Sequence, residues 1–246
     1  MNINDKVIVI TGAASGIGRA TACKFAYEGA RVVVADLNEV GGVETVHLIK
    51  KAGGEAAYIK TDVTNVQDVE KAVDFAVETY GSIDIMFNNA GTGGRAPLLE
   101  HDPEMYDRVI KVNQYGVYYG ILAAARKMKE LGIQGVIVNN GSTFGFLASN
   151  QGIIGYHTSK AAVKMMTQCA AIELASYGIR VVGIAPGFVD TPISKRPKDR
   201  ATGKHMRNEL IHPEAIADAV YLLCQNGANV INGSTVMLDD GYAVFK

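Results

Sequence analysis

Short runs of β-branched residues alternate with helical stretches from one end of this sequence to the other. Val7 to Ile10 is the first such run, and a glycine-rich turn separates it from a helical stretch that starts near Gly16. Alternation of this kind is typical of βαβ units, in which helices join buried parallel strands. The pattern predicts strands near 7–10, 31–35, 56–60, 83–87, 136–139, 179–184 and 235–238, and helices near 16–28, 39–52, 69–80, 104–130, 156–177 and 213–224.

Right-handed crossovers between successive strands wind such a chain into one open sheet. We therefore expect an α/β fold with a single doubly wound Rossmann-type domain. Its sheet should be mostly parallel, with about seven strands and with helices on both faces. The alternation runs through all 246 residues without a linker-like stretch, so we predict one domain that spans 1–246.

The turn after the first strand reads Thr11-Gly12-Ala13-Ala14-Ser15-Gly16-Ile17-Gly18. Gly12 permits a sharp turn, Gly16 permits backbone to approach a pyrophosphate, and Gly18 permits close packing of the helix on the sheet. The free N–H groups at the start of the helix favour phosphate. The spacing differs from the common G-x-G-x-x-G, and an ordinary strand–helix turn is the alternative. In this context we predict dinucleotide binding by the turn, including Ser15 and Ile17.

Asp36 ends the second predicted strand, 18 residues after Gly18. A carboxylate at this position of the fold accepts hydrogen bonds from the adenosine ribose, and it repels the 2′-phosphate of NADP. Leu37, the next residue, offers no compensating cation, although Arg19 is nearby in sequence. We therefore expect the cofactor to be NAD. The alternative is that Asp36 only caps a turn.

The overall composition argues against several classes of partner. The formal net charge is -1, which gives no electrostatic case for binding nucleic acid or an anionic membrane. The three cysteines are far apart and odd in number, so a disulfide framework is not expected. The amino-terminal residues do not resemble a signal peptide, and we see no apolar run as long as a membrane span. These features favour a cytoplasmic protein.

Tyr156 and Lys160 open the predicted helix 156–177 and share one of its faces. A phenol is a poor base at neutral pH, but a nearby ammonium favours the phenolate and lowers the phenol pKa. Tyr156 could then exchange a proton with an alcohol or carbonyl oxygen. A Tyr-x-x-x-Lys spacing alone also fits an ordinary amphipathic helix.

Further motifs stand beside this pair in the order of the chain. Ser142 follows the fifth predicted strand, 14 residues before Tyr156, and Asn88 to Gly91 ends the fourth. With these motifs the sequence closely resembles the short-chain dehydrogenase/reductase family over essentially its whole length. The residues that carry the resemblance are the glycine turn, Asp62-Val63, Asn88 to Gly91, Asn113, Ser142, Tyr156, Lys160, Pro186-Gly187 and Leu238 to Tyr242.

The resemblance implies an oxidoreductase that moves a hydride between NAD(H) and a secondary alcohol or ketone. It implies that Tyr156 is the general acid/base and that Ser142 orients the substrate oxygen. It implies that Lys160 binds the nicotinamide ribose and shifts the Tyr156 pKa. It also implies that Asn113 holds a water molecule that links Lys160 to solvent. Asn113 could instead hold a bulge in its helix.

The same resemblance implies that many residues outside the glycine turn bind the cofactor. Asp62 and Val63 would contact the adenine, although Asp62 could simply cap a loop. Asn89, Ala90 and Gly91 would lie on the adenosine side of the cofactor. Pro186, Gly187, Val189 and Thr191 would flank the nicotinamide. The resemblance also implies a homo-oligomer, a tetramer or dimer, with the helices 104–130 and 156–177 at one interface and the C-terminal strand at another.

Two features depart from the family pattern without removing a catalytic group. The interval from Ser142 to Tyr156 is one residue longer than the commonest family spacing, so we expect the loop between them to bulge. Gly141 stands where many relatives have serine.

Substrate identity would be decided by the loops over the cleft. Residues 190–213 are expected to form a flap, and they hold six cations against three anions. We expect Arg95 or a flap cation such as Arg196 to hold an anionic group of the small-molecule substrate, the alternative being a solvated, mobile lid. Phe144, Phe146, Leu147 and Ile154 would form an apolar wall near Ser142, or would simply pack in the core.

The five histidines lack the spacing of a metal site, so no metal is expected. Two other functions stay open. A 3-oxoacyl-thioester reductase of the same family is one, although such relatives mostly use NADP, against which Asp36 argues. A non-catalytic NAD-binding sensor is the other, but such proteins usually lose Ser, Tyr or Lys, whereas Ser142, Tyr156 and Lys160 are all present.

Overall fold

The computed structural model describes residues 1–193 and 205–244. Its centre is a seven-stranded sheet in the order β3-β2-β1-β4-β5-β6-β7, and every pairing of neighbouring strands is parallel. The sheet confirms the predicted fold class and all seven predicted strands. The strands are β1 (Val7–Thr11), β2 (Arg31–Asp36), β3 (Glu55–Lys60), β4 (Ile85–Asn88), β5 (Val136–Asn140), β6 (Arg180–Pro186) and β7 (Thr235–Leu238).

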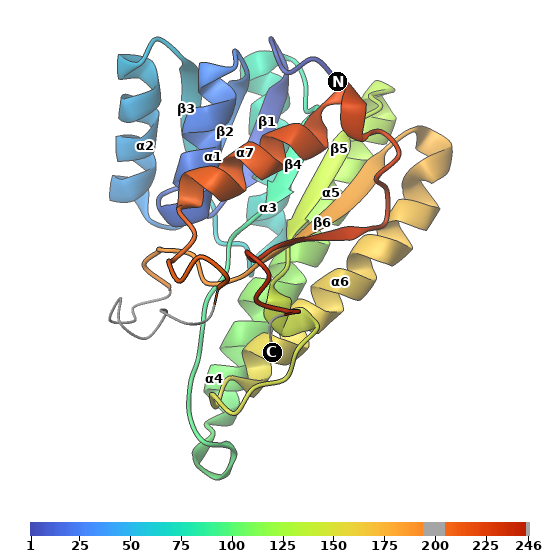
Figure 1. Ribbon diagram of the computed structural model, residues 1–246. Coiled ribbons are helices and arrows are strands. Elements are labelled where there is room, and N and C mark those ends of the chain that lie inside the picture. Colours follow the sequence, from blue (N-terminus) through green and yellow to red (C-terminus); the bar gives the residue numbers. More distant parts are fainter. Residues whose placement is uncertain (194–204, 245–246) are drawn as a thin grey trace.

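Helices cover both faces of this sheet (Figure 1). The helices α1 (Gly16–Tyr27), α2 (Glu39–Lys51) and α7 (Pro213–Cys224) lie on one face. The other face carries α3 (Val66–Tyr80), α5 (Gly116–Leu131) and α6 (Ile154–Leu174), while α4 (Pro103–Ile110) lies beyond the end of the sheet and packs against α6. Strand order reverses at β1, which lies between β2 and β4. In open α/β sheets, ligands bind outside the carboxyl ends of the strands at such a switch point.

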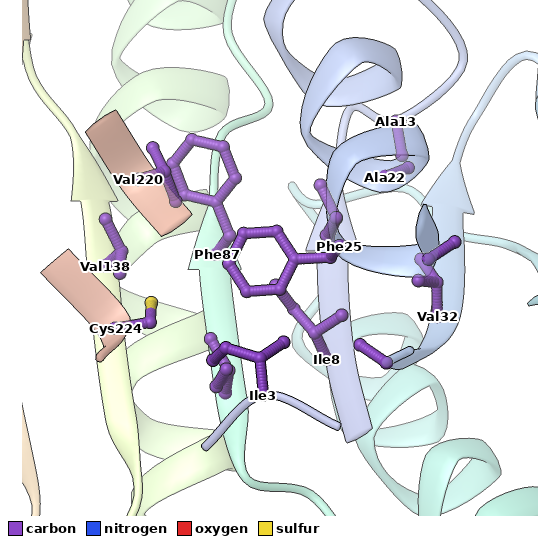
Figure 2. Close-up of a cluster of buried hydrophobic side chains, with 14 of the residues drawn as sticks. Ile3, Ile8, Ala13, Ala22, Phe25, Val32, Phe87, Val138, Val220 and Cys224 are labelled. Carbon is purple, nitrogen blue, oxygen red and sulfur yellow. The ribbon is translucent and has the colours of Figure 1, made fainter. Parts of the chain in front are cut away.

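Alternate residues of each central strand supply the two halves of the core. Ile8 of β1 and Phe87 of β4 pack against Phe25 of α1 and Val220 of α7, and all four side chains are fully buried (Figure 2). Val9 of β1 belongs instead to the cluster under α3, α5 and α6. Because both faces are buried, the strands are continuously apolar rather than alternating. This is why the β-branched runs predicted the strands so well.

The predicted helix 104–130 is interrupted in the structure. A π-helical segment, Lys111–Tyr115, separates α4 from α5, and it directs Asn113 into the interior, where the side chain is fully buried. Single π turns often occur at functional sites. The prediction of one unbroken helix was therefore wrong at this point, because amphipathic periodicity does not distinguish α from π turns over five residues.

No helix within the described part of the chain is both long enough and apolar enough to span a bilayer.

Candidate active site

The glycine turn between β1 and α1 adopts a conformation that only glycine fits. Gly12 has φ +66°, and a Cβ there would lie 2.7 Å from the Cα of Ala90. A Cβ on Gly18 would lie 2.2 Å from the Gly12 carbonyl oxygen, so Gly18 permits α1 to pack on the turn itself. Gly16 has φ +52° and faces Thr191. The first turn of α1 has no acidic residue, so its N–H groups and the bare glycine backbone suit an anionic pyrophosphate.

Hydrogen bonds of Thr11, at the end of β1, and of Asn89 and Asn140, at the ends of the neighbouring strands, hold this turn in place. The Asn89 side chain donates from Nδ2 to the carbonyls of Thr11 (2.9 Å) and Gly12 (3.1 Å), and its Oδ1 accepts from Asn140 Nδ2 at 3.0 Å. The Thr11 hydroxyl accepts from the backbone N–H groups of Asn89 (3.0 Å) and Ala90 (3.1 Å). Sequence reasoning missed Thr11 and Asn140 as part of the site. A polar residue at the end of an otherwise apolar buried strand was the signal available.

Asp36 lies at the carboxyl end of β2, as predicted. Its Oδ2 accepts from the backbone N–H of Ala14 in the glycine turn, and its Oδ1 accepts from the N–H of Asn38, both at 2.8 Å. The carboxylate is thus fixed next to the turn by two backbone donors. Arg19, the nearby cation, donates from Nη2 to the Ala14 carbonyl and pairs with Glu44 at 2.7 Å.

The remaining residues predicted for the adenine end lie at the ends of β2 and β3. Leu37 is exposed, and Val63 is buried against Gly116 of α5. Asp62 accepts at Oδ1 from the backbone N–H (2.9 Å) and hydroxyl (2.7 Å) of Thr64, so its side chain caps a loop. Ser15 precedes α1 and makes no side-chain cap. The structure does not place these residues in the cleft that contains Tyr156.

Ser142, Tyr156 and Lys160 meet in a cleft of about 610 Å³ at the carboxyl ends of β4, β5 and β6. The Ser142 hydroxyl lies near enough to the Tyr156 phenol to favour its ionised form, and it accepts a hydrogen bond from the Phe144 N–H at 3.2 Å. Lys160 is 3% exposed, and its Nζ donates to the Asn140 carbonyl at 2.6 Å. The same Nζ lies 5.6 Å from the centre of the Tyr156 ring. The predicted cluster is therefore assembled.

Burial, rather than charge, dominates the protonation of this pair. Desolvation raises the pKa of the Tyr156 phenol, and the nearby Ser142 hydroxyl only partly opposes it. Desolvation also lowers the pKa of the Lys160 ammonium to about 8. The Lys160 ammonium donates to the Asn140 carbonyl, and its predicted effect on the Tyr156 pKa stays a prediction.

Asn113 makes its direct hydrogen bonds to Thr92, in the loop after β4, and to Ser159, and the predicted link from Asn113 to Lys160 through a water stays a prediction. Its Oδ1 accepts from the Thr92 N–H at 2.7 Å, and its Nδ2 donates to the Thr92 carbonyl at 2.9 Å and to the Ser159 hydroxyl at 3.2 Å. These contacts agree with the alternative of a residue that stabilises a helix bulge. They also fix Gly91, where a Cβ would lie 3.8 Å from Lys160 Nζ.

The segment after β6 forms the far wall of the cleft, with Pro186, Gly187, Phe188, Val189 and Thr191 lining it. His205 anchors this wall, because its Nε2 accepts from the Phe188 N–H at 3.1 Å while its Nδ1 contacts the Glu209 carbonyl at 2.7 Å. Since a carbonyl only accepts, Nδ1 carries the proton. Sequence reasoning had given His205 no role, and nothing in the local sequence indicated one.

The predicted substrate residues are only partly brought together. Arg95 and Phe144 line the cleft with Ser142. Ile154 does not: it lines a neighbouring hollow of about 600 Å³ with Phe146 and Leu147. The proposed apolar wall is therefore wrong except at Phe144, because the 3-10 turn at Thr143–Gly145 carries the next residues away. Arg196 and the rest of the segment 194–204 of the predicted flap lie outside the described residues.

The two departures from the family pattern have structural explanations. A Cβ at Gly141 would lie 2.7 Å from the carbonyl oxygen of Ile184, so the strand pairing favours glycine there. The longer interval before Tyr156 is taken up by the 3-10 turn and the loop that follows it. In the described part of the chain, no three His, Cys, Asp or Glu side chains gather as metal ligands.

Together, the glycine turn at the switch point and the Ser–Tyr–Lys cluster beside it define an α/β oxidoreductase of the nucleotide-binding class. The sequence model of the short chain dehydrogenases matches residues 6–201. The chain therefore belongs to the short-chain dehydrogenase/reductase family.

Relatives and solved structures agree with this assignment. The chain is 35% identical to an L-2,3-butanediol dehydrogenase of Corynebacterium glutamicum, covering 96% of this chain and 98% of that protein. It is 37% identical to a cis-4-hydroxycyclohexanecarboxylate dehydrogenase of Sinomonas cyclohexanicum, covering 97% and 96%. A short-chain type dehydrogenase/reductase from Mycobacterium marinum superposes with a TM-score of 0.95 at 31% identity, covering 99% and 97%. The protein is thus an oxidoreductase that acts on alcohol groups with a nicotinamide cofactor.

Proposed function

We propose that this protein is an NAD-dependent dehydrogenase of secondary alcohols, with Tyr156 as the general acid/base. The observation that carries the proposal is that Ser142, Tyr156 and Lys160 line one cleft at the carboxyl ends of the strands. A substrate oxygen bound between Ser142 and Tyr156 would contact both hydroxyls. The two acidic protons would then lie where charge develops on that oxygen.

Tyr156 has a raised pKa, so its neutral form predominates and is ready to donate a proton to a carbonyl oxygen. In the reverse direction it must accept a proton from the alcohol, and a nearby positive charge would then favour the phenolate. Lys160 supplies such a charge from a buried position. When bound, the nicotinamide supplies or accepts the hydride.

The cofactor would be held along the edge of the sheet that follows β1, β2, β3, β4 and β6. We assign to it the residues that the family pattern indicates, and Lys160 and Tyr156 would contact it from α6. The remaining residues of the set are Gly12, Ser15, Gly16, Ile17, Gly18, Asp36, Leu37, Asp62, Val63, Asn89, Ala90, Gly91, Pro186, Gly187, Val189 and Thr191.

The preference for NAD rests on Asp36. Backbone N–H groups hold its carboxylate next to the glycine turn, where it can accept from ribose hydroxyls and repel a 2′-phosphate. Arg19 offers little compensation, since Glu44 already neutralises it. Among the described residues, the pairing of Arg19 with Glu44 thus favours NAD over NADP, which carries an additional 2′-phosphate.

The relatives named above act on an open-chain diol and on a ring alcohol, and both substrates contain secondary alcohols. Phe144 and Phe188 add apolar surface to the cleft, which suits the hydrocarbon part of such an alcohol. We further propose that the protein is cytoplasmic, forms a homo-oligomer, and binds neither nucleic acid nor membrane.

A substrate panel tests this proposal. Cyclic and open-chain secondary alcohols, the matching ketones, a primary alcohol and a 3-oxoacyl thioester would each be offered with NAD(H) and with NADP(H), and nicotinamide absorbance would be followed. We expect turnover of secondary alcohols with NAD. Turnover of the thioester alone would support the reductase alternative, and tight NAD binding without any turnover would support a sensor.

A further inference from the structure

The loop after β4 presents a cation that the proposed chemistry does not use. Arg95 lines the same cleft as Ser142 and Tyr156, and its side chain is exposed. Its Nη2 donates to Gln151 Oε1 at 3.2 Å, and it takes part in none of the ion pairs found among the described residues. A guanidinium has five N–H donors, so one neutral partner leaves most of them available.

The backbone on both sides of Arg95 is fixed. The N–H of Ala96 donates to the Gly152 carbonyl at 2.9 Å, and the two segments pack so closely that a Cβ on Gly152 would lie 2.5 Å from the Ala96 carbonyl oxygen. On the other side, a Cβ on Gly94 would lie 2.7 Å from the Met105 side chain of α4. Arg95 therefore extends from a fixed backbone at the cleft wall, which lowers the backbone entropy lost when it binds a ligand.

The charge of the cleft is one-sided. Among the described lining residues, Arg95 and Lys160 are cationic, and none is aspartate or glutamate. Lys160 is buried and donates to the Asn140 carbonyl, so it is committed to the catalytic cluster. An anion that enters the cleft meets an exposed guanidinium and no like charge from these residues.

We propose that Arg95 binds a carboxylate of the substrate, so that the preferred substrates are secondary alcohols or ketones that also carry a carboxylate. The planar fork of a guanidinium matches a carboxylate with two parallel hydrogen bonds. This inference rests on the proposed function and adds the substrate class to it. Arg95 acts here as a specificity residue, since the proton chemistry belongs to Tyr156 and Ser142.

The test compares two matched pairs of substrates, each a carboxylate and its carboxamide, in the wild-type protein and in three variants. The substrates are 3- and 4-hydroxycyclohexanecarboxylate and the corresponding primary carboxamides, which have nearly the same shape without the charge. The variants are Arg95→Gln, Arg95→Lys and, as a surface control, Arg126→Gln. The Arg126 side chain is 66% exposed, pairs with Glu70 of α3 and does not line the cleft. The quantity compared is the ratio of kcat/KM for the carboxylate to kcat/KM for the carboxamide.

We expect the wild-type ratio to favour the carboxylate and to fall by about 10- to 100-fold in Arg95→Gln, mainly through KM. Arg95→Lys should keep part of the preference, because it keeps the charge but not the fork. Arg126→Gln should keep all of it. A wild-type ratio near one, or an Arg95→Gln ratio equal to that of the wild type, would overturn the inference about Arg95. Turnover of the carboxamide in the same experiment would still support the proposed function. No turnover of either substrate, nor of simple cyclic alcohols, would refute the proposed function itself.

Discussion

Lys160 is the residue at which function and stability conflict most directly. It is 3% exposed, and burial lowers its pKa to about 8, so at neutral pH the folded protein must keep a charged amine away from water. The Asn140 carbonyl satisfies one of its three donors. The position is therefore costly for the fold and is explained by the chemistry of Tyr156 beside it.

Replacing Lys160 by methionine should stabilise the folded protein near neutral pH. The pKa falls from 10.5 to about 8 on folding, which corresponds to a cost of about 3 kcal/mol below pH 8. Between pH 8 and 10.5 the unfolded chain binds more protons, so wild-type stability gains on the variant as pH rises. Urea unfolding at pH 7 and pH 10 should show the advantage of Lys160→Met shrinking by about 2 to 3 kcal/mol. A difference that is constant with pH would refute the buried ammonium.

Asp36→Asn should change which cofactor is used. The amide keeps the size of the side chain but removes the charge that would repel a 2′-phosphate. We expect the ratio of kcat/KM for NADP to that for NAD to rise by at least about tenfold. The control is Asp107→Asn, a change on α4 where the carboxylate pairs with Lys111. An unchanged ratio in Asp36→Asn would mean that the carboxylate only caps the turn.

At this scale the sequence was informative where chemistry is carried by residue type and spacing. Tyr156, Lys160 and Ser142 were assigned because several motifs together resemble one family, whereas the Tyr-x-x-x-Lys spacing alone also fits an ordinary amphipathic helix. Asn140 was missed although it ends an apolar strand, and His205 could not be found, because its partner is the backbone N–H of Phe188, 17 residues away along the chain. Ile154 was misplaced because the path of a loop has no periodicity to follow.

Among the elements, α5 packs closely on the sheet at Gly120. A Cβ on Gly120 would lie 1.7 Å from Asn88 Oδ1, so the helix touches β4 through bare backbone. Asn88 donates to Asn139 at 2.9 Å, and Asn139 donates to the Thr167 hydroxyl at 3.0 Å. This buried polar chain joins β4, β5 and α6 under the catalytic cluster.

Gly120→Ala should therefore lower the free energy of unfolding by about 2 to 4 kcal/mol, since the methyl group must displace Asn88 and disturb its hydrogen bond. Gly227→Ala is the matched control, because a Cβ there meets nothing within 4 Å and the backbone is not left-handed. Its effect should stay within about 0.5 kcal/mol. Equal urea midpoints for the two variants would contradict the close packing of α5.

The strands and most helices could be predicted because burial on both faces makes each strand apolar and each helix amphipathic. The π segment could not. It depends on the bonds from Asn113 to Thr92, which lies on the loop after a different strand. Such a contact exists only once β4 and α5 have been brought together.

On the whole molecule, an apolar stripe on α6 faces solvent. Ala161, Met165, Cys169 and Ile172 are all exposed and follow one another at helical spacing, with Ile172 79% exposed. Exposed tyrosines, Tyr115 among them, lie on the neighbouring elements. Contiguous apolar surface of this kind marks an interface between proteins.

We expect light scattering to give a mass that is a multiple of 26.2 kDa, with α5 and α6 pairing against a second copy of the chain. Met165→Glu together with Ile172→Glu should reduce that mass at least twofold, because each places a charge in an apolar contact. Lys50→Glu on α2 is the control, since it alters exposed charge away from the stripe. A wild-type mass of one chain would contradict this account of the surface.

The central claim is that the Tyr156 hydroxyl exchanges a proton with the substrate oxygen, and Tyr156→Phe tests it most directly. Turnover of a secondary alcohol and NAD binding would both be measured, with Tyr177→Phe, an exposed tyrosine after α6, as the matched control. The account predicts that turnover falls by about 10² to 10⁴-fold in Tyr156→Phe, while NAD still binds and Tyr177→Phe retains full activity. Turnover by Tyr156→Phe at the wild-type rate would contradict it.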